Sequence, residues 1–152
     1  MITVSDTRTL ADDSGGALAC DLLGAAGHRV ALREIVKDDT AAIRAALGRG
    51  LASPDCALVV LTGGTGVAKR DVTPEAVAKL LERPLPGFGE LFRQLSFAEI
   101  GAAAMLSRAF GGMAQGKPVF ALPGSRAAIQ LALERLILPE LGHLVGEARK
   151  RG

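Results

Sequence analysis

The chain has 152 residues, 49% of them apolar and 22% charged, with 18 basic and 16 acidic side chains and a net charge of +2. This is the length and composition of one globular domain, which argues against a disordered, fibrous or membrane-embedded chain. Near-neutral charge, no Trp or Tyr and only five Phe also argue against nucleic-acid binding and against ligand recognition by aromatic cages.

Strand-like and helix-like stretches alternate along the chain, which is typical of a largely parallel sheet covered on both faces. The first half predicts a strand at 2–5, a helix at 13–26, a strand at 29–36, a helix capped by Asp38 or Asp39 that ends before the 53–55 turn, and a buried strand at 57–61. The second half predicts a helix from a Thr73 cap to before Pro84, a helix at 87–100, a strand at 118–122, and a last helix from Ser125 that Pro139 ends. We therefore predict one α/β domain.

A glycine-rich turn follows the buried strand and is the most informative segment. It comprises Gly63, Gly64, Thr65 and Gly66, and Lys69, Arg70 and Asp71 come shortly after it. Glycines at this edge of a parallel sheet let backbone N–H groups approach anionic ligands. The turn is neither a Walker loop, which needs Gly at 68, nor a dinucleotide fingerprint, which needs Gly at 69. A tight turn without a ligand is the alternative, but three glycines followed by charges favour a binding loop.

Two aspartates are candidates for chemistry beside this loop. Asp71 could hold a hydrated Mg²⁺ against phosphate oxygens, since Mg²⁺ needs only one or two protein carboxylates. The alternative is an ion pair with Arg70 or Lys69. Asp38 ends the second strand at the same edge, but by itself it could be a helix cap, and Asp39 could serve equally well.

Other polar residues end neighbouring strands. Pro123, Gly124 and Ser125 stand where a strand meets a helix N-terminus, which suits an anion, although Ser125 would also cap the helix without any ligand. Ser5 and Asp6 end the first strand on the same side and could join the site or form a simple turn.

The remaining special residues give structural interpretations. Cys20 and Cys56 are too few for a disulfide scaffold and are interpreted as small core residues, and two His exclude a His-rich metal site. His143 is interpreted as a surface partner of Glu147. The basic cluster of Arg149, Lys150 and Arg151 is interpreted as a solvated tail. Since the sequence shows no leader and no apolar run of roughly 18 residues, we expect a cytoplasmic location and no membrane partner.

Taken together, these motifs resemble those of the MoaB/MogA family of molybdenum cofactor biosynthesis proteins. The similarity covers nearly the whole chain and includes the glycine turn with its continuation to residue 76, and segments 4–8, 35–39, 86–90, 92–101, 106–109 and 122–125. Segment 92–101 is closer to the MoaB branch than to the MogA branch.

The resemblance implies a three-layer α/β/α domain over residues 1–152 with a mostly parallel sheet, which assembles as a homotrimer or homohexamer. It also implies Mg²⁺-dependent adenylylation of molybdopterin by ATP, with release of pyrophosphate. By motif match, Asp38 and Asp71 take the catalytic and metal-binding roles. The implied ligand-binding residues are Ser5, Asp6, Gly63, Gly64, Thr65, Gly66, Arg70, Ser107, Pro123, Gly124 and Ser125.

Two other functions stay open at this point. One is a protein that binds or carries molybdopterin without chemistry, and the other is a relative that acts on another nucleotide-containing molecule, as CinA-type proteins suggest. In either case, the lack of Trp and Tyr means that backbone groups and aliphatic side chains must hold the ring systems. We expect Phe88, Phe92, Phe97 and Phe110 to pack in a core or a subunit interface.

Overall fold

A six-stranded sheet forms the centre of the computed structural model, which describes residues 1–150. Its strand order is β2-β1-β3-β6-β5-β4. The strands are β1 (Ile2–Val4), β2 (Glu34–Val36), β3 (Val59–Thr62), β4 (Arg83–Pro84), β5 (Phe110–Ala114) and β6 (Lys117–Leu122). β2, β1, β3 and β6 run parallel, whereas β5 and β4 continue the sheet in antiparallel pairing. The carboxyl ends of β1, β2, β3 and β6 therefore meet at one edge, which we call the carboxyl rim.

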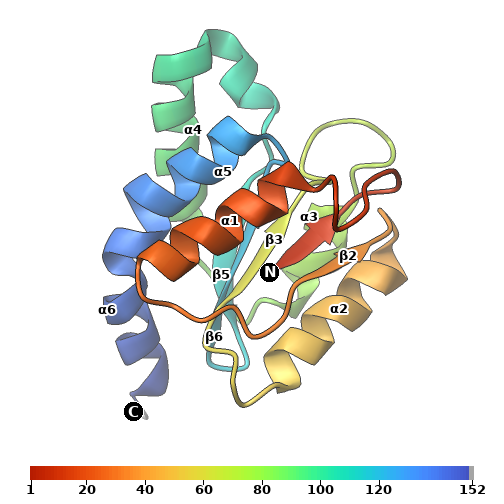
Figure 1. Cartoon of the computed structure of the whole chain (residues 1–152). Coiled ribbons are helices and arrows are strands. Elements are labelled where there is room, and N and C mark those ends of the chain that lie inside the picture. Colours follow the sequence, from red (N-terminus) through yellow and green to blue (C-terminus); the bar gives the residue numbers. More distant parts are fainter. Residues whose placement is uncertain (151–152) are drawn as a thin grey trace.

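Helices cover both faces of this sheet. α1 (Ser14–Ala25) and α5 (Arg126–Ala132) lie side by side on one face, and α2 (Thr40–Ala52) and α3 (Thr73–Val77) lie on the other (Figure 1). Two buried apolar clusters separate the three layers, one around Phe92, Leu122 and Ile129 and the other around Ile43 and Leu61. The predicted α/β architecture with a mostly parallel sheet is confirmed.

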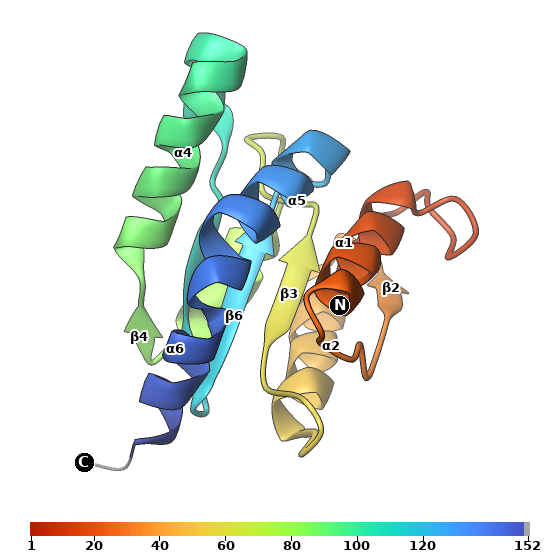
Figure 2. The ribbon, with the colours of Figure 1, turned by 60° about the vertical axis from the view of Figure 1, so that its left-hand side comes forward.

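Helix α4 (Pro86–Ile100) reaches beyond the edge of the sheet, as Figure 2 shows, and is followed by the 3₁₀ segment η2 (Gly101–Leu106). Phe88 and Phe92 point inward from α4, and the Phe88 ring lies 4.8 Å from that of Phe120. Phe110 is half-buried against the second cluster. Phe97, by contrast, is 63% exposed, so the expectation that it packs in the core of this chain is wrong, and an interface role stays a prediction.

Several predicted elements need correction. The second strand covers only 34–36, and the helix expected to reach Pro84 is α3 followed by a 3₁₀ turn, η1 (Ala78–Leu80). Strand β5 was not predicted, because Gly111 and Gly112 break its pattern; a Cβ at Gly111 would lie 2.7 Å from Cε1 of the Phe120 ring.

The last helix does not end at Pro139. A π-helical segment, η3 (Leu133–Ile137), joins α5 to α6 (Leu138–Arg149), and Pro139 lies in the first turn of α6, where its missing N–H needs no partner. In the expected basic tail, Arg149 and Lys150 are exposed and Lys150 pairs with Glu147, while Arg151 lies outside the described residues.

Candidate functional site

The glycine loop, residues 63–66, lies at the carboxyl rim beside the loop that follows β6. The Gly63 N–H donates to the Leu122 carbonyl at 2.9 Å, and a Cβ built at Gly124 would stand 3.5 Å from the Gly63 Cα. The parallel pairing of β3 with β6 produces this contact, because both strands end at the same level. The structure thus brings residues 63–66 and 123–125 together.

Glycine is required at the first two positions of this loop. Gly63 has φ +94° and Gly64 has φ +64°, values that side chains disfavour. A Cβ at Gly63 would collide with the Val4 carbonyl oxygen at the end of β1. A Cβ at Gly64 would collide with the Thr73 hydroxyl and lie 2.8 Å from the Asp38 carboxylate. Small residues here let β1 and Asp38 lie directly against the loop backbone.

Asp38 is not the cap of α2. Asp39 caps that helix by accepting the Ala42 N–H at 2.9 Å, which leaves the Asp38 carboxylate facing the loop. Asp38 accepts the Val72 N–H at 3.3 Å, and its own backbone N–H donates to Asp6 at 3.1 Å. The pattern of two consecutive aspartates did not distinguish cap from site, whereas the structure does.

The Asp38 carboxyl is held in an unfavourable electrostatic setting. Burial raises the pKa of Asp38, and the negative charges of Asp71 and Asp6 raise it further, against the opposing effects of the Val72 N–H and the Arg70 charge. A carboxylate that is partly desolvated beside other carboxylates is typical of a functional site.

Asp71 also faces the loop. Its carboxylate accepts the Ala68 N–H at 2.9 Å, and Oδ2 would lie 2.7 Å from a Cβ at Gly66. Within residues 1–150 no ion pair joins Asp71 to Lys69 or Arg70, whose side chains are exposed. The simple ion-pair interpretation of Asp71 is therefore not what the structure shows.

These two carboxylates could hold a divalent cation. Asp38 approaches the loop at Gly64 and Asp71 approaches it at Gly66, and the charge of Asp71 raises the pKa of Asp38. Neither carboxylate forms an ion pair within residues 1–150. In the described part of the chain no three His, Cys, Asp or Glu side chains converge on a metal position. Such a donor set suits Mg²⁺, which keeps several waters and binds one or two carboxylates together with phosphate oxygens.

The predicted serines adopt local structural roles at the rim. Ser125 caps α5 by accepting the Ala128 N–H at 3.2 Å, and Ser5 accepts the N–H groups of Thr7 and Arg8 in a turn. Ser107 accepts the Ala109 N–H at 3.3 Å and precedes a residue that contacts the glycine loop directly. Ser5 and Ser125 stand at the strand ends where the sequence placed them, whereas Ser107 was named only by the family resemblance; contact of all three with a ligand stays a prediction.

Sequence reasoning gave no role to Arg108 and misassigned Thr73. The Arg108 N–H donates to the Thr65 carbonyl at 2.9 Å, and its guanidinium donates to the carbonyls of Gly66 and Asp71. Thr73 lies inside the first turn of α3 rather than capping it, and its hydroxyl donates to the Gly63 carbonyl at 2.9 Å. The only sequence signal for Arg108 was its place in the 106–109 motif.

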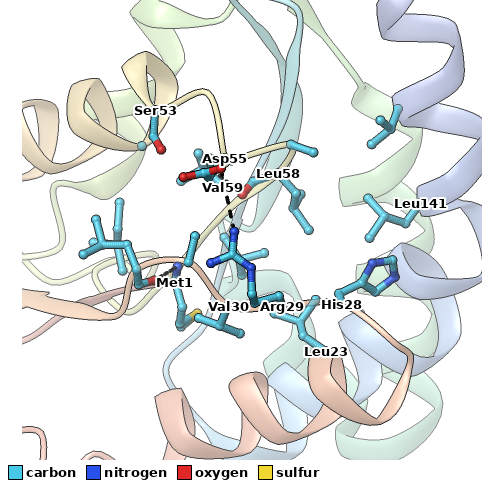
Figure 3. Close-up of a pocket in the computed structure, with 18 of the residues that line it drawn as sticks. Met1, Leu23, His28, Arg29, Val30, Ser53, Asp55, Leu58, Val59 and Leu141 are labelled. Carbon is cyan, nitrogen blue, oxygen red and sulfur yellow. Dashed lines mark hydrogen bonds and ion pairs between the residues drawn. The ribbon is translucent and has the colours of Figure 1, made fainter.

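A cavity of about 510 Å³ lies at the opposite edge of the sheet (Figure 3). It is lined in part by Met1, Leu23, Val30, Leu58, Val59 and Leu141, at the amino ends of β1 and β3. Arg29 and Asp55 face one another there at 3.8 Å. None of the predicted site residues lines this cavity, and its walls carry no glycine loop or carboxylate pair, so we assign the candidate site to the carboxyl rim.

Two peripheral expectations have clear outcomes. His143 lies on the surface of α6, 3.5 Å from Glu147 and 3.2 Å from Glu140, as its interpretation as a surface residue predicted. Cys20 and Cys56, interpreted from the sequence as small core residues, are only partly buried, and Cys56 packs against the edge of the second apolar cluster. Among residues 1–150, no helix is both long and apolar enough to cross a membrane.

Comparison with known proteins identifies the family of this chain. Residues 1–143 match the family model described as "Probable molybdopterin binding domain". The chain is 51% identical over 152 residues to Molybdenum cofactor biosynthesis protein B of Bacillus cereus, covering 99% of this chain and 90% of that protein.

Solved structures extend the match to three dimensions. A crystal structure of Molybdenum cofactor biosynthesis protein B has a TM-score of 0.96 at 51% identity, covering 99% of this chain and 94% of that one. The tungsten cofactor synthesizing protein MoaB from Pyrococcus furiosus has a TM-score of 0.86 at 37% identity, covering 98% and 94%. The chain therefore belongs to the MoaB/MogA family of molybdopterin-binding domains, on the MoaB side, and has a role in molybdenum cofactor biosynthesis.

Proposed function

We propose that the protein adenylylates molybdopterin with Mg²⁺ and ATP at the carboxyl rim. The observation that carries this proposal is that the carboxylates of Asp38 and Asp71 both approach the glycine loop, at Gly64 and Gly66, and form no ion pair within the described part of the chain. Membership in a molybdopterin-binding family supports the pterin as one substrate. A glycine loop at the carboxyl rim with two carboxylates beside it supports a nucleotide with Mg²⁺ as the other.

The reaction needs no covalent enzyme intermediate. An oxygen of the molybdopterin phosphate attacks the α-phosphorus of ATP and forms a new P–O bond. The bond from the α-phosphorus to the oxygen bridging to the β-phosphate breaks, and pyrophosphate leaves with that electron pair. Nucleotidyl transfer of this kind depends mainly on positioning and charge neutralisation.

Each part of the rim has a task in this scheme. Backbone N–H groups of the glycine loop bind phosphate oxygens, and the exposed guanidinium of Arg70 adds positive charge near them. Asp38 and Asp71 would hold Mg²⁺, which supplies charge neutralisation when bound. Gly124 and Ser125 line the neighbouring wall at the N-terminus of α5, which favours a second anionic group such as the pterin phosphate.

Pyrophosphate release tests this proposal. Purified protein with ATP, Mg²⁺ and molybdopterin should release pyrophosphate, and Asp71→Asn should reduce the rate by at least about a hundredfold, the scale of losing a metal or electrostatic group. Asp55→Asn is the matched control, because Asp55 is 69% exposed and lies at the opposite edge of the sheet. No release above the Asp71→Asn background, with pterin binding unaffected by ATP and by Asp38→Asn, would instead indicate a pterin carrier.

We further propose that the protein acts as a homotrimer or homohexamer in the cytoplasm. Apolar side chains that are at least half exposed gather on α4 and η2: Leu91, Phe97, Ile100, Met105 and Leu106. Exposed apolar side chains in this number mark an interaction surface. The projection of α4 beyond the sheet supports burial of this surface against another copy of the chain (Figure 2).

A further inference from the structure

Arg108 connects a distant part of the chain to the glycine loop. It stands between η2 and β5, 42 residues from Gly66. Its Nε donates to the Gly66 carbonyl at 2.7 Å, another guanidinium nitrogen donates to the Asp71 carbonyl, and the third binds the Glu75 carboxylate in the first turn of α3. One planar side chain thus bonds both ends of the 66–71 segment.

The position of Arg108 is itself fixed by neighbouring residues. Arg93 of α4 donates to the carbonyls of Ser107 and Ala109, at 3.4 Å and 2.9 Å, and so holds the backbone on both sides of Arg108. On the other side, the Arg108 hydrogen bond lowers the pKa of Glu75, which keeps that carboxylate charged as a partner. The guanidinium is therefore preorganised between α4 and α3.

Bonds to carbonyls set the direction of the next amides. In a planar trans peptide, the C=O of one residue and the N–H of the following residue point in opposite directions. Arg108 draws the carbonyls of Thr65 and Gly66 toward itself, so the N–H groups of Gly66 and Val67 point away from it. Neither N–H donates a hydrogen bond to another group within residues 1–150.

The same geometry orients the peptide unit between Asp71 and Val72. Its carbonyl points to Arg108, and the N–H of the same peptide unit, on Val72, points to the Asp38 carboxylate at 3.3 Å. The guanidinium therefore orients two N–H groups of the site: that of Val67, which has no hydrogen-bond partner within residues 1–150, and that of Val72, which holds Asp38. The Gly66 N–H is oriented by the backbone N–H of Arg108, which bonds the Thr65 carbonyl.

We propose that Arg108 is a positioning residue, which holds the glycine loop and Asp38 in the conformation that binds the nucleotide phosphates. This inference rests on the proposed adenylyltransferase function. Arg108 itself touches no substrate in this scheme. When the competent conformation is only a fraction of the population, apparent affinity falls by that fraction, whereas saturating ligand restores the conformation. Loss of Arg108 therefore raises the KM for ATP more than it lowers kcat.

The test compares Arg108→Met and Arg108→Lys with the control Arg49→Met. Arg49 also forms an arginine–carboxylate pair, with Glu34 at 2.6 Å, but at the far end of α2. For Arg108→Met we expect the KM for MgATP to rise about tenfold and kcat to change less than threefold. Lys carries one ammonium group in place of the planar guanidinium with its three nitrogen donors. The KM of Arg108→Lys should therefore stay at least about threefold above that of wild type. Arg49→Met should match wild type.

Hydrogen–deuterium exchange of the unliganded protein gives a readout independent of activity. Arg108→Met should speed exchange of the hydrogen-bonded amides of Ala68, Asp71 and Val72 by about tenfold, with the core strands unchanged. A lower kcat at unchanged KM, with exchange faster throughout the sheet, would show a general stability role and overturn the proposal. Full recovery by Lys would also overturn it. Absence of turnover in wild type would contradict the adenylyltransferase function, while exchange of these three amides would still decide the role of Arg108.

Discussion

Two aspartates near β1 and β2 show how this sequence separates folding from function at the level of single residues. Asp13 is buried and would have a raised pKa from burial alone, but hydrogen bonds from the Gly16 N–H, the Thr3 hydroxyl and Arg33 outweigh that effect and lower its pKa. The pKa of Asp38 is raised. Asp13 thus stabilises the fold in its charged form, whereas charged Asp38 destabilises it.

Asp38→Asn should therefore stabilise the protein while it abolishes activity. Because the folded state raises the pKa of Asp38, the charge costs stability above the folded pKa, and this cost disappears as the pH falls below the ordinary Asp value of about 3.9. At pH 7 we therefore expect the Tm of Asp38→Asn to lie above that of wild type. Thermal unfolding followed by circular dichroism measures this shift.

The neighbouring Asp39→Asn is the control for this substitution. Asn is as good a helix cap as Asp, so the Tm should change little. The gain from Asp38→Asn should also shrink when the scan is repeated near pH 4. A lower Tm for Asp38→Asn at pH 7 would mean that the Asp38 charge is compensated, contrary to the electrostatics described above.

At the scale of elements, the strand-to-helix turn from β3 to α3 carries the site and tolerates little change. Gly64→Ala should destabilise the protein by roughly 1–3 kcal/mol, because of the positive φ and the collision with Thr73. Gly48→Ala in α2 is the matched control, since a Cβ there meets nothing within 4 Å, and it should stabilise by up to about 1 kcal/mol. Urea unfolding measures both; equal effects of the two substitutions would contradict the assigned loop geometry.

The elements that sequence patterns predicted well are those with uninterrupted periodicity. The apolar run at 57–61 and the stripe of α2 correspond to observed elements, and parallel strands explain why Asp38, the glycine loop and Ser125 share one edge. Strand β5 was not predicted, because its two glycines interrupt the apolar pattern. Pro139 predicted the end of the last helix at a point where the chain continues as α6. Arg108 could not be placed, because 42 residues separate it from the loop and only folding brings the two together.

At the scale of the whole molecule, the exposed apolar surface of α4 and η2 lies outside the carboxyl rim. The double substitution Phe97→Asp/Ile100→Asp should convert an oligomer into single chains, because each side chain is more than 60% exposed and a charge at a buried interface is costly. Light scattering coupled to size-exclusion chromatography measures the mass. Leu80→Asp, at a position 39% exposed on η1, should leave the oligomer intact. A wild-type protein that runs as a single chain would contradict the proposed assembly.

A crystal structure of the protein soaked with ATP and Mg²⁺ tests the central claim most directly, since it locates the nucleotide on the molecule. We predict phosphate oxygens within hydrogen-bond distance of the Gly66 and Val67 N–H groups, with a metal ion bound by Asp71 and Asp38 at the carboxyl rim. Nucleotide density in the cavity beside Met1 and Leu141 instead, with the glycine loop free of phosphate, would contradict the assignment of the site.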